Sequence, residues 1–375
     1  MLLRTFSFYP SFQCLAAACK DNCCIGWEID IDTAALQAYR GVQGAFGRRL
    51  QKNIVTEGTS HFALHEGGRC AFLNKDNLCD IILTLGEGAL CKICARHPRY
   101  FTWFESVTEG GVGLACEEAA RLLFASEKPL TFTETQIADM PEAPAAGVCT
   151  QALFAARDTM IRLLQTRSYT PAQRMGLALA LAEAVQHRLE TEDAVGIRDI
   201  SRQYEDVAFQ QALCGAFAAH RGTPQQQAHS AAALLALYRR MDVLDTHWAV
   251  ALQSASTALG QLLAQKDAFL QQLGTRQAEY EHLLVYYIFR YFMQGSFDGD
   301  VLGKVHLAVA SVLLGQLLDV QRWIQNGGTY TLADRIQLAK SYSKETEYCE
   351  ANLARIAKAS VDSELFQLET LLQLL

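Results

Sequence analysis

The sequence predicts a mainly α-helical protein, with an irregular cysteine-rich metal-binding module at its N-terminal end and a helical bundle or array behind it. Nine of the twelve cysteines lie before residue 117. The later part is rich in Ala, Leu and Gln, with apolar residues at helical spacing. Two prolines and a glycine within residues 139–147 interrupt any regular element between the two parts. We therefore expect two domains, 1–140 and 141–375.

The cysteine-rich part is expected to contain only short elements. A helix is predicted over Thr33–Tyr39, since Asp32 or Thr33 can cap its first turn. The remaining expected elements are short strands or extended loops at His61–Leu64 and Cys70–Leu73, an aromatic strand at Arg99–Phe104, and a helix at Cys116–Ser126 with acidic residues in its first turn.

Seven helices are expected in the second part. Proline favours the first turn of a helix, which places helix starts at Pro171 and Pro224, the latter capped by Thr223. The predicted ranges are Ala152–Gln165, Pro171–Leu189, Pro224–Arg240, His247–Leu263, Ala278–Met293, Lys304–Ile324 and Thr331–Leu374, the last with a break near Ser360. Aromatic residues nearly encircle Ala278–Met293, which indicates a buried helix. No fixed-period repeat supports a solenoid.

Charge and hydropathy exclude some classes of protein. The net charge of −7 and pI near 5.8 argue against a nucleic-acid binder, which needs basic side chains to neutralise phosphates. The first 13 residues lack the apolar core of a secretion signal. The apolar run Val305–Leu318 is shorter than the roughly 20 residues that cross a bilayer. We expect a cytoplasmic protein without a membrane or nucleic-acid partner, and a homo-oligomer remains open.

Clustered thiols in a reducing compartment more often bind metal than form disulfides. The candidate metal ligands are Cys14, Cys19, Cys23, Cys24, Cys70, Cys79, Cys91, Cys94 and Cys116. Cys91 and Cys94 form a CxxC pair, whose spacing lets two thiolates reach one metal. Long gaps between the other cysteines favour an iron–sulfur cluster, of the 4Fe-4S type, collected from separate loops. Zinc, and buried thiols or disulfides without metal, remain the alternatives.

The cysteines and their neighbours carry a family resemblance. The relevant segments are Cys14, Cys19 and Cys23-Cys24, then Arg69-Cys70-Ala71-Phe72-Leu73, Leu78-Cys79, and Cys91-Lys92-Ile93-Cys94 followed by His97-Pro98-Arg99. This pattern resembles the eight-cysteine zinc- or iron-chelating domain family, and within it the members that methylate flagellin lysines. The sequence Tyr342-Ser343-Lys344-Glu345 is similar as well. The opening cysteines are spaced more widely than the family's CxxCxxCC.

The resemblance implies methyl transfer from S-adenosylmethionine to lysine side chains of flagellin, in a protein that carries an iron–sulfur cluster. The sequence has no GxGxxG motif after a strand and no CxxxCxxC triplet, so neither a Rossmann-type donor site nor radical chemistry is supported. A deprotonated lysine amine can displace the sulfonium methyl directly. A metal-binding interaction protein without catalysis is the alternative from another class.

Residues after the CxxC pair are candidates for binding the methyl donor. Arg96 and Arg99 could pair with its carboxylate, because a guanidinium binds a carboxylate through two parallel hydrogen bonds. Tyr100 and Trp103 could stack on its adenine. Surface ion pairs and core packing are the ordinary alternatives for these four side chains.

Several acidic residues and one histidine are further candidates. Glu105 and Glu109 are candidate bases for the lysine proton. His97 could ligate a metal or hydrogen-bond a cluster sulfur. An acidic run could guide a cationic lysine, although a solvated acidic edge is the favoured interpretation; its members are Glu28, Asp30 and Asp32. The isolated thiols are expected to be small apolar fillers, namely Cys149, Cys214 and Cys349.

Overall fold

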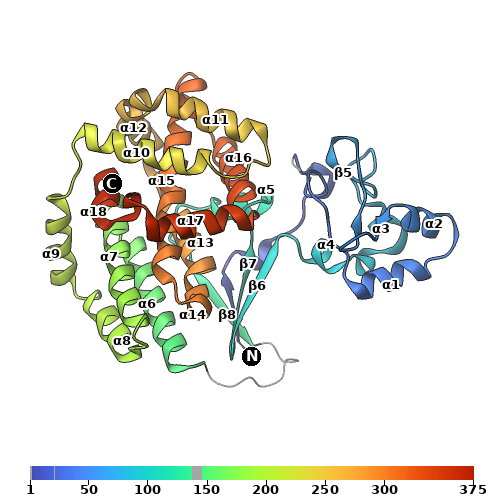
Figure 1. Cartoon of the computed structure of the whole chain (residues 1–375), viewed down its shortest axis with the longest axis horizontal. Helices are drawn as coiled ribbons and strands as arrows, with labels where there is room; N and C mark the ends of the chain where they lie inside the picture. Colours follow the sequence, from blue (N-terminus) through green and yellow to red (C-terminus); the bar gives the residue numbers. More distant parts are fainter. Residues whose placement is uncertain (1, 21, 137–145) are drawn as a thin grey trace. The chain divides into compact units, whose positions relative to one another are not determined.

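The computed structural model of the chain describes residues 2–20, 22–136 and 146–375 (Figure 1). Two compact units are present. The helical unit comprises Met1–Ser7, Thr102–Glu109 and Leu123–Leu375, and the cysteine-rich unit comprises Phe8–Phe101 and Gly110–Leu122. Each unit is thus built from separated segments of the chain. The interruption predicted within residues 139–147 falls mainly on 137–145, which lie outside the described residues.

A four-stranded sheet, with strand order β6-β7-β1-β8, is formed by Arg99–Phe104 (β6), Val107–Val112 (β7), Leu2–Phe6 (β1) and Phe132–Gln136 (β8). β1 and β8 pair antiparallel, from Leu2 opposite Gln136 to Phe6 opposite Phe132. Phe6 is only 1% exposed and contacts the Phe132 and Phe289 rings. The strand at Arg99–Phe104 is confirmed, whereas β1, β7 and β8 were not expected.

The mainly helical character predicted for the chain is confirmed. The helices of the second part are α6 (Val148–Gln165), α7 (Pro171–Leu189), α8 (Ala194–Gln203), α9 (Val207–Ala218), α10 (Pro224–Arg239), α11 (Thr246–Thr257), α12 (Leu259–Leu273), α13 (Ala278–Tyr291), α14 (Gly295–Asp298), α15 (Val301–Gln325), α16 (Leu332–Tyr342), α17 (Glu350–Asp362) and α18 (Leu368–Leu374). A π-helical turn, Ser343–Glu347, follows α16. Thr170, Thr223 and Thr331 form capping boxes at α7, α10 and α16.

Two of the predicted helices are wrong in length. The range predicted as His247–Leu263 is two helices, because α11 ends at Thr257 and α12 begins at Leu259. The range predicted as Thr331–Leu374 is interrupted by the π-helical turn, which was not expected, and again at Ser363, whose extended backbone gives the break predicted near Ser360. The short helices α8 and α9 were not expected; Asp193 and Asp206 cap them.

Helix α15 forms the core of the helical unit, and 19 of its 25 residues are buried. It packs against α7, α10, α11, α12, α13, α16 and α17 (Figure 1). By length and composition alone α15 could cross a membrane, but 83% of its apolar window is buried inside the protein. Its apolar residues therefore pack against other helices. The prediction that Ala278–Met293 is buried is also confirmed, since α13 packs along α15 and has only two residues that are not buried.

One histidine of α15 gives a prediction about stability and pH. His306 is 3% exposed, shares a 2.7 Å hydrogen bond with the Ser360 hydroxyl, and packs on the Phe366 ring. Burial lowers the pKa of His306 from 6.5 to about 4. The unfolded chain therefore binds an extra proton between these pH values, so stability falls on acidification through this window. We expect this group to contribute roughly 3 kcal/mol to that fall in the free energy of unfolding.

Urea unfolding of the wild type and of His306→Gln, measured at intervals between pH 7 and pH 4, tests this expectation. The variant should lose that part of the pH dependence. The matched control is His247→Gln, because the His247 side chain is 93% exposed, and it should follow the wild-type curve. Equal pH dependence in all three proteins would contradict the assignment to His306.

The cysteine-rich unit consists of short elements around a small core. These are α1 (Thr33–Gly41), α2 (Gly44–Lys52), β2 (Ile54–Val55), β3 (His61–Phe62), β4 (Leu64–His65), β5 (Arg69–Cys70), α3 (Asp80–Leu85), α4 (Lys92–Arg96) and α5 (Glu117–Leu123), whose last residue belongs to the helical unit. The predicted cap is confirmed, because the Asp32 carboxylate accepts the Ala35 N–H. The core contains Ile29, Ile31, Tyr39, Leu50, Phe62, Phe72 and Ile81.

Candidate functional site

Five of the predicted ligand cysteines pack on the core of the cysteine-rich unit. These are Cys24, Cys70, Cys79, Cys91 and Cys94. The backbone holds several of them in place: Cys70 N–H donates to the Cys24 carbonyl at 2.8 Å, and Cys79 and Cys91 are the N-cap residues of α3 and α4. Loops and helix starts far apart in the sequence thus bring these five thiols to one small core.

Two pairs of these thiols are hydrogen-bonded, Cys23 with Cys24 and Cys91 with Cys94, and this perturbs their pKa values. A hydrogen bond with Cys23, together with burial and the nearby thiols of Cys70 and Cys79, raises the pKa of Cys24. A hydrogen bond between Cys91 and Cys94 lowers the pKa of Cys91 to about 7 and raises that of Cys94. A site rich in thiols therefore exists in the cysteine-rich unit.

Three further predicted ligands lie near one another. Burial raises the pKa of Cys116 to about 11, and the neighbouring thiols of Cys19 and Cys23 add to this rise. Cys14 is exposed, and its sulfur accepts the Ala16 N–H at 3.4 Å. Across residues 2–20, 22–136 and 146–375, no three His, Cys, Asp or Glu side chains are placed to hold a metal ion. The ligand set therefore stays a prediction.

Of the four residues predicted to bind the methyl donor, three lie on β6 and one lies on α4, the helix before it. Arg96 is exposed in the last turn of α4. Arg99 and Trp103 project to the same side of β6, because strand residues alternate, and Tyr100 projects to the other. The Arg99 guanidinium lies 4.9 Å from the centre of the Phe12 ring. Trp103 belongs to the helical unit and is 51% exposed. Their role in donor binding remains a prediction.

The candidate bases have different surroundings. Glu105 is exposed in the turn between β6 and β7. Glu109 is buried and paired with Arg157 at 2.5 Å, so its carboxylate stabilises a buried guanidinium. Asp32 caps α1 and also accepts the Lys92 N–H, which lowers its pKa. The Asp32 carboxylate is therefore engaged in hydrogen bonds to backbone N–H groups at the starts of α1 and α4, which is a structural role.

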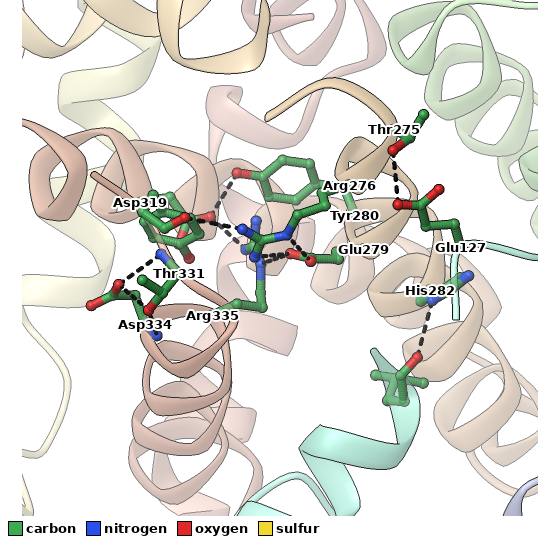
Figure 2. A network of polar contacts seen from close by, with 12 residues as sticks. Glu127, Thr275, Arg276, Glu279, Tyr280, His282, Asp319, Thr331, Asp334 and Arg335 are labelled. Atoms are coloured by element: carbon green, nitrogen blue, oxygen red, sulfur yellow. Dashed lines mark hydrogen bonds and ion pairs between the residues drawn. The ribbon is translucent and has the colours of Figure 1, made fainter. Parts of the chain in front are cut away.

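A buried network of charged and aromatic side chains lies in the helical unit and was not found by sequence reasoning (Figure 2). Arg335 is 1% exposed and donates to Glu279 at 2.9 Å and to Asp319 at 2.5 Å. Asp319, fully buried in the middle of α15, also accepts hydrogen bonds from the hydroxyls of Tyr280 and Tyr330. Three helices, α13, α15 and α16, are thereby joined through one carboxylate and one guanidinium.

The charges in this network balance one another. Burial raises the pKa of Asp319, while Arg335 and the two tyrosine hydroxyls oppose that rise. Burial alone would lower the pKa of Arg335, but Asp319, the tyrosines and Glu279 hold it well above its usual value. One donor nitrogen of Arg335, Nη2, is buried and has no hydrogen-bond partner within the described part of the chain.

The π-helical turn lies beside this network and anchors a loop. Glu345 accepts the backbone N–H groups of Leu244 and Asp245 at 2.9 and 2.6 Å, so the turn holds the start of α11. Glu347 accepts the hydroxyls of Tyr286 and Tyr291. The Tyr342-Ser343-Lys344-Glu345 sequence thus enters a π-helical segment, a feature that is frequent at functional sites.

A cavity of about 430 Å³ opens next to the anchored loop, and we call it the Trp248 cavity. Its lining residues include Asp245, Trp248, Ala251, Asp319, Arg322, Tyr330, Asp334 and Gln337. Trp248, Leu318 and Leu338 also line a second, much smaller space of about 20 Å³. Arg335 and Tyr342 border this inner space. Aromatic rings and carboxylates therefore line the Trp248 cavity, and a buried guanidinium borders the inner space, which shares three lining residues with it.

Fold and site together define a class of protein in which a helical unit, with a buried charged network and a cavity, is combined with a cysteine-rich unit. Residues 157–374 match the FliB lysine N-methylase C-terminal domain. Because this match covers more than half of the chain, the chain belongs to the FliB lysine N-methylase family. No solved structure matches the chain.

Curated relatives agree with this assignment. The flagellar biosynthetic protein FliU of Salmonella muenchen is 33% identical over 122 residues, which is 30% of this chain and 70% of that protein. The lysine-N-methylases of Salmonella typhimurium and Salmonella choleraesuis are each 27% identical over 141 residues, or 35% of this chain. The match spans 34% of the length of each lysine-N-methylase.

Proposed function

We propose that this chain is a cytoplasmic S-adenosylmethionine-dependent lysine N-methyltransferase that modifies flagellin and carries a cysteine-bound iron–sulfur cluster. The observation that supports methyl transfer most directly is the match of residues 157–374 to the FliB lysine N-methylase C-terminal domain. The names of the relatives add lysine methylation and a flagellar role. The donor, the substrate and the cluster come from the resemblance of the cysteine-rich sequence.

The donor set of the cysteine-rich unit fits the proposed cluster by its chemistry. Thiolates are the ligands of iron–sulfur clusters, and the unit gathers five thiols on one core. The thiols that would hold the cluster are drawn from Cys24, Cys70, Cys79, Cys91 and Cys94, together with Cys23, which hydrogen-bonds Cys24. When bound, such a cluster would supply iron, whose reactivity the surrounding side chains tune through hydrogen bonds to its ligands and through solvent access. Zinc, which also takes thiolates, is the competing metal.

The transfer itself needs a neutral lysine amine. Its pKa of about 10.4 in water keeps it protonated at neutral pH, so the site has to remove one proton before reaction. In the transfer, the nitrogen–carbon bond forms as the sulfur–carbon bond of the sulfonium breaks, and the thioether leaves neutral.

Anaerobically purified protein, incubated with S-adenosylmethionine and purified flagellin, tests the proposal. Flagellin should gain mass in steps of one methylene group, and peptide mapping should place the gain on lysines. A reaction without the methyl donor is the control. Unmodified flagellin from protein that is folded and loaded with metal would contradict the proposed function.

A further inference from the structure

We propose that the Trp248 cavity binds the methyl donor, with the nucleoside of S-adenosylmethionine against Trp248 and its carboxylate at Arg335. This inference rests on the proposed function and gives it a location in the helical unit. The cavity volume of about 430 Å³ lies in the range of small-molecule sites. It exceeds what one extended lysine side chain fills, which favours the donor over the substrate as occupant.

The wall of the cavity suits a nucleoside. Trp248 is 6% exposed and lines both the outer cavity and the inner space, so its indole can stack on a flat base. Within the described residues, no hydrogen bond occupies the indole N–H of Trp248. The carboxylates of Asp245 and Asp334 line the outer cavity and can accept hydrogen bonds from the ribose hydroxyls.

The inner space suits the amino-acid end of the donor. Arg335 borders this space and is 1% exposed, and its Nη2 is a buried donor without an acceptor. A buried donor left unpaired carries a desolvation cost, which a hydrogen bond to a ligand oxygen would recover. The space of about 20 Å³ has room for one small polar group. A carboxylate oxygen is the acceptor that a guanidinium binds best.

Carboxylates and aromatic rings also fit the positive charge of the donor. Tyr330, Trp248 and Asp245 all line the cavity. A sulfonium is attracted to aromatic faces and to carboxylates as an ammonium is. The anchoring of Leu244 and Asp245 by Glu345 fixes this edge relative to the π-helical turn. The reacting sulfur would thus lie near the segment that carries the buried tyrosines.

Isothermal titration of the full chain with S-adenosylhomocysteine tests the location without requiring methyl transfer. Two variants fill the cavity from different helices: Ala251→Phe on α11 and Gln337→Trp on α16. We expect each to weaken binding by about tenfold or more, the equivalent of about 1.4 kcal/mol. The matched control is Val250→Phe, on the same helix as Ala251 but 67% exposed and outside the cavity, and it should bind as the wild type does.

A second ligand tests the contact with Arg335. Methylthioadenosine keeps the nucleoside and lacks the amino-acid end, so it should bind the wild type at least about tenfold more weakly than S-adenosylhomocysteine does. Equal affinities for the two ligands would overturn the assignment of the carboxylate to Arg335. Circular dichroism spectra of all variants establish that they are folded, and Gln337→Trp decides the test if Ala251→Phe does not fold, because Gln337 is exposed.

The outcomes separate this inference from the proposed function. If both cavity variants bind S-adenosylhomocysteine as tightly as the wild type while flagellin is still methylated, the location is wrong and the function stands. If the wild type methylates no flagellin, but both cavity variants bind S-adenosylhomocysteine more weakly than the wild type does, the location is supported and the proposed substrate is wrong. If the folded wild type binds no S-adenosylhomocysteine, the proposed site is overturned.

Discussion

Replacement of Arg335 by alanine is expected to lower the free energy of unfolding by about 3–5 kcal/mol. The guanidinium is 1% exposed and is the shared partner of Glu279 and Asp319, at 2.9 and 2.5 Å. Its removal would leave Asp319, which is fully buried, without its cation, whereas Glu279 would keep its ion pair with Arg276 at 2.7 Å. Urea unfolding monitored by circular dichroism, at neutral pH and constant ionic strength, measures the loss.

The matched control for this experiment is an exposed arginine pair. Arg202 lies 3.2 Å from Asp199, with the two side chains 73% and 64% exposed. Arg202→Ala should change the free energy of unfolding by no more than about 1 kcal/mol, because water and ions screen exposed pairs. A loss below about 1 kcal/mol for Arg335→Ala would show that the buried network contributes little, contrary to the distances and burial described above.

Replacement of Cys94 by alanine is expected to abolish loading of the proposed metal centre and, with it, the proposed methylation of flagellin. Cys94 shares a hydrogen bond with Cys91 and lies near Cys24 and Cys70, so it stands at the meeting point of the thiols. Cys23→Ala, next to Cys24 in sequence, should have the same effect. Iron, sulfide and zinc analysis with visible absorption, on protein purified without oxygen, measures the loading. A 4Fe-4S centre would give about four irons per chain.

Cys214→Ala is the control for this pair of variants. Cys214 is buried on α9 and belongs to the helical unit, not to the cysteine-rich unit. Its replacement should therefore leave the metal content unchanged. Wild-type iron content in both Cys94→Ala and Cys23→Ala would refute the ligand assignment. A colourless protein with stoichiometric zinc would replace the iron–sulfur proposal with a zinc centre.

Local signals explain which elements could be predicted from the sequence. Helices α7 and α10 begin at prolines that follow a capping threonine, and their starts were predicted correctly. The break between α11 and α12 at Ala258 has no proline to announce it, and the nearest glycine, Gly260, lies inside α12. Strand β1 was missed for another reason. Its partner β8 lies about 130 residues away, and short strands depend on such long-range pairing more than on local preference.

The same distinction between local signals and long-range contacts applies to the candidate site. Thiols are rare enough for their clustering to be visible in sequence, and the structure places five of them on one core. The buried network depends on three residues that are far apart in the chain, Glu279, Asp319 and Arg335, and only folding brings them together. The one available signal was Asp319, a charge in an otherwise apolar stretch of α15, where a buried carboxylate requires a partner.

The pairing of β1 with β8 and the burial of Arg157 against Glu109 have a consequence for any shortened form of this protein. A shortened protein that kept only residues 157–374, the range that matches the family, would lack Phe6 and Glu109. Arg157, which is fully buried, would then lose the carboxylate of Glu109. His282, whose ring nitrogens bond the carbonyls of Leu123 and Lys128, would also lose both partners. The family match is therefore not a unit of folding. The cysteine-rich unit is inserted into the helical unit, and the flanking segments have to remain if it is removed.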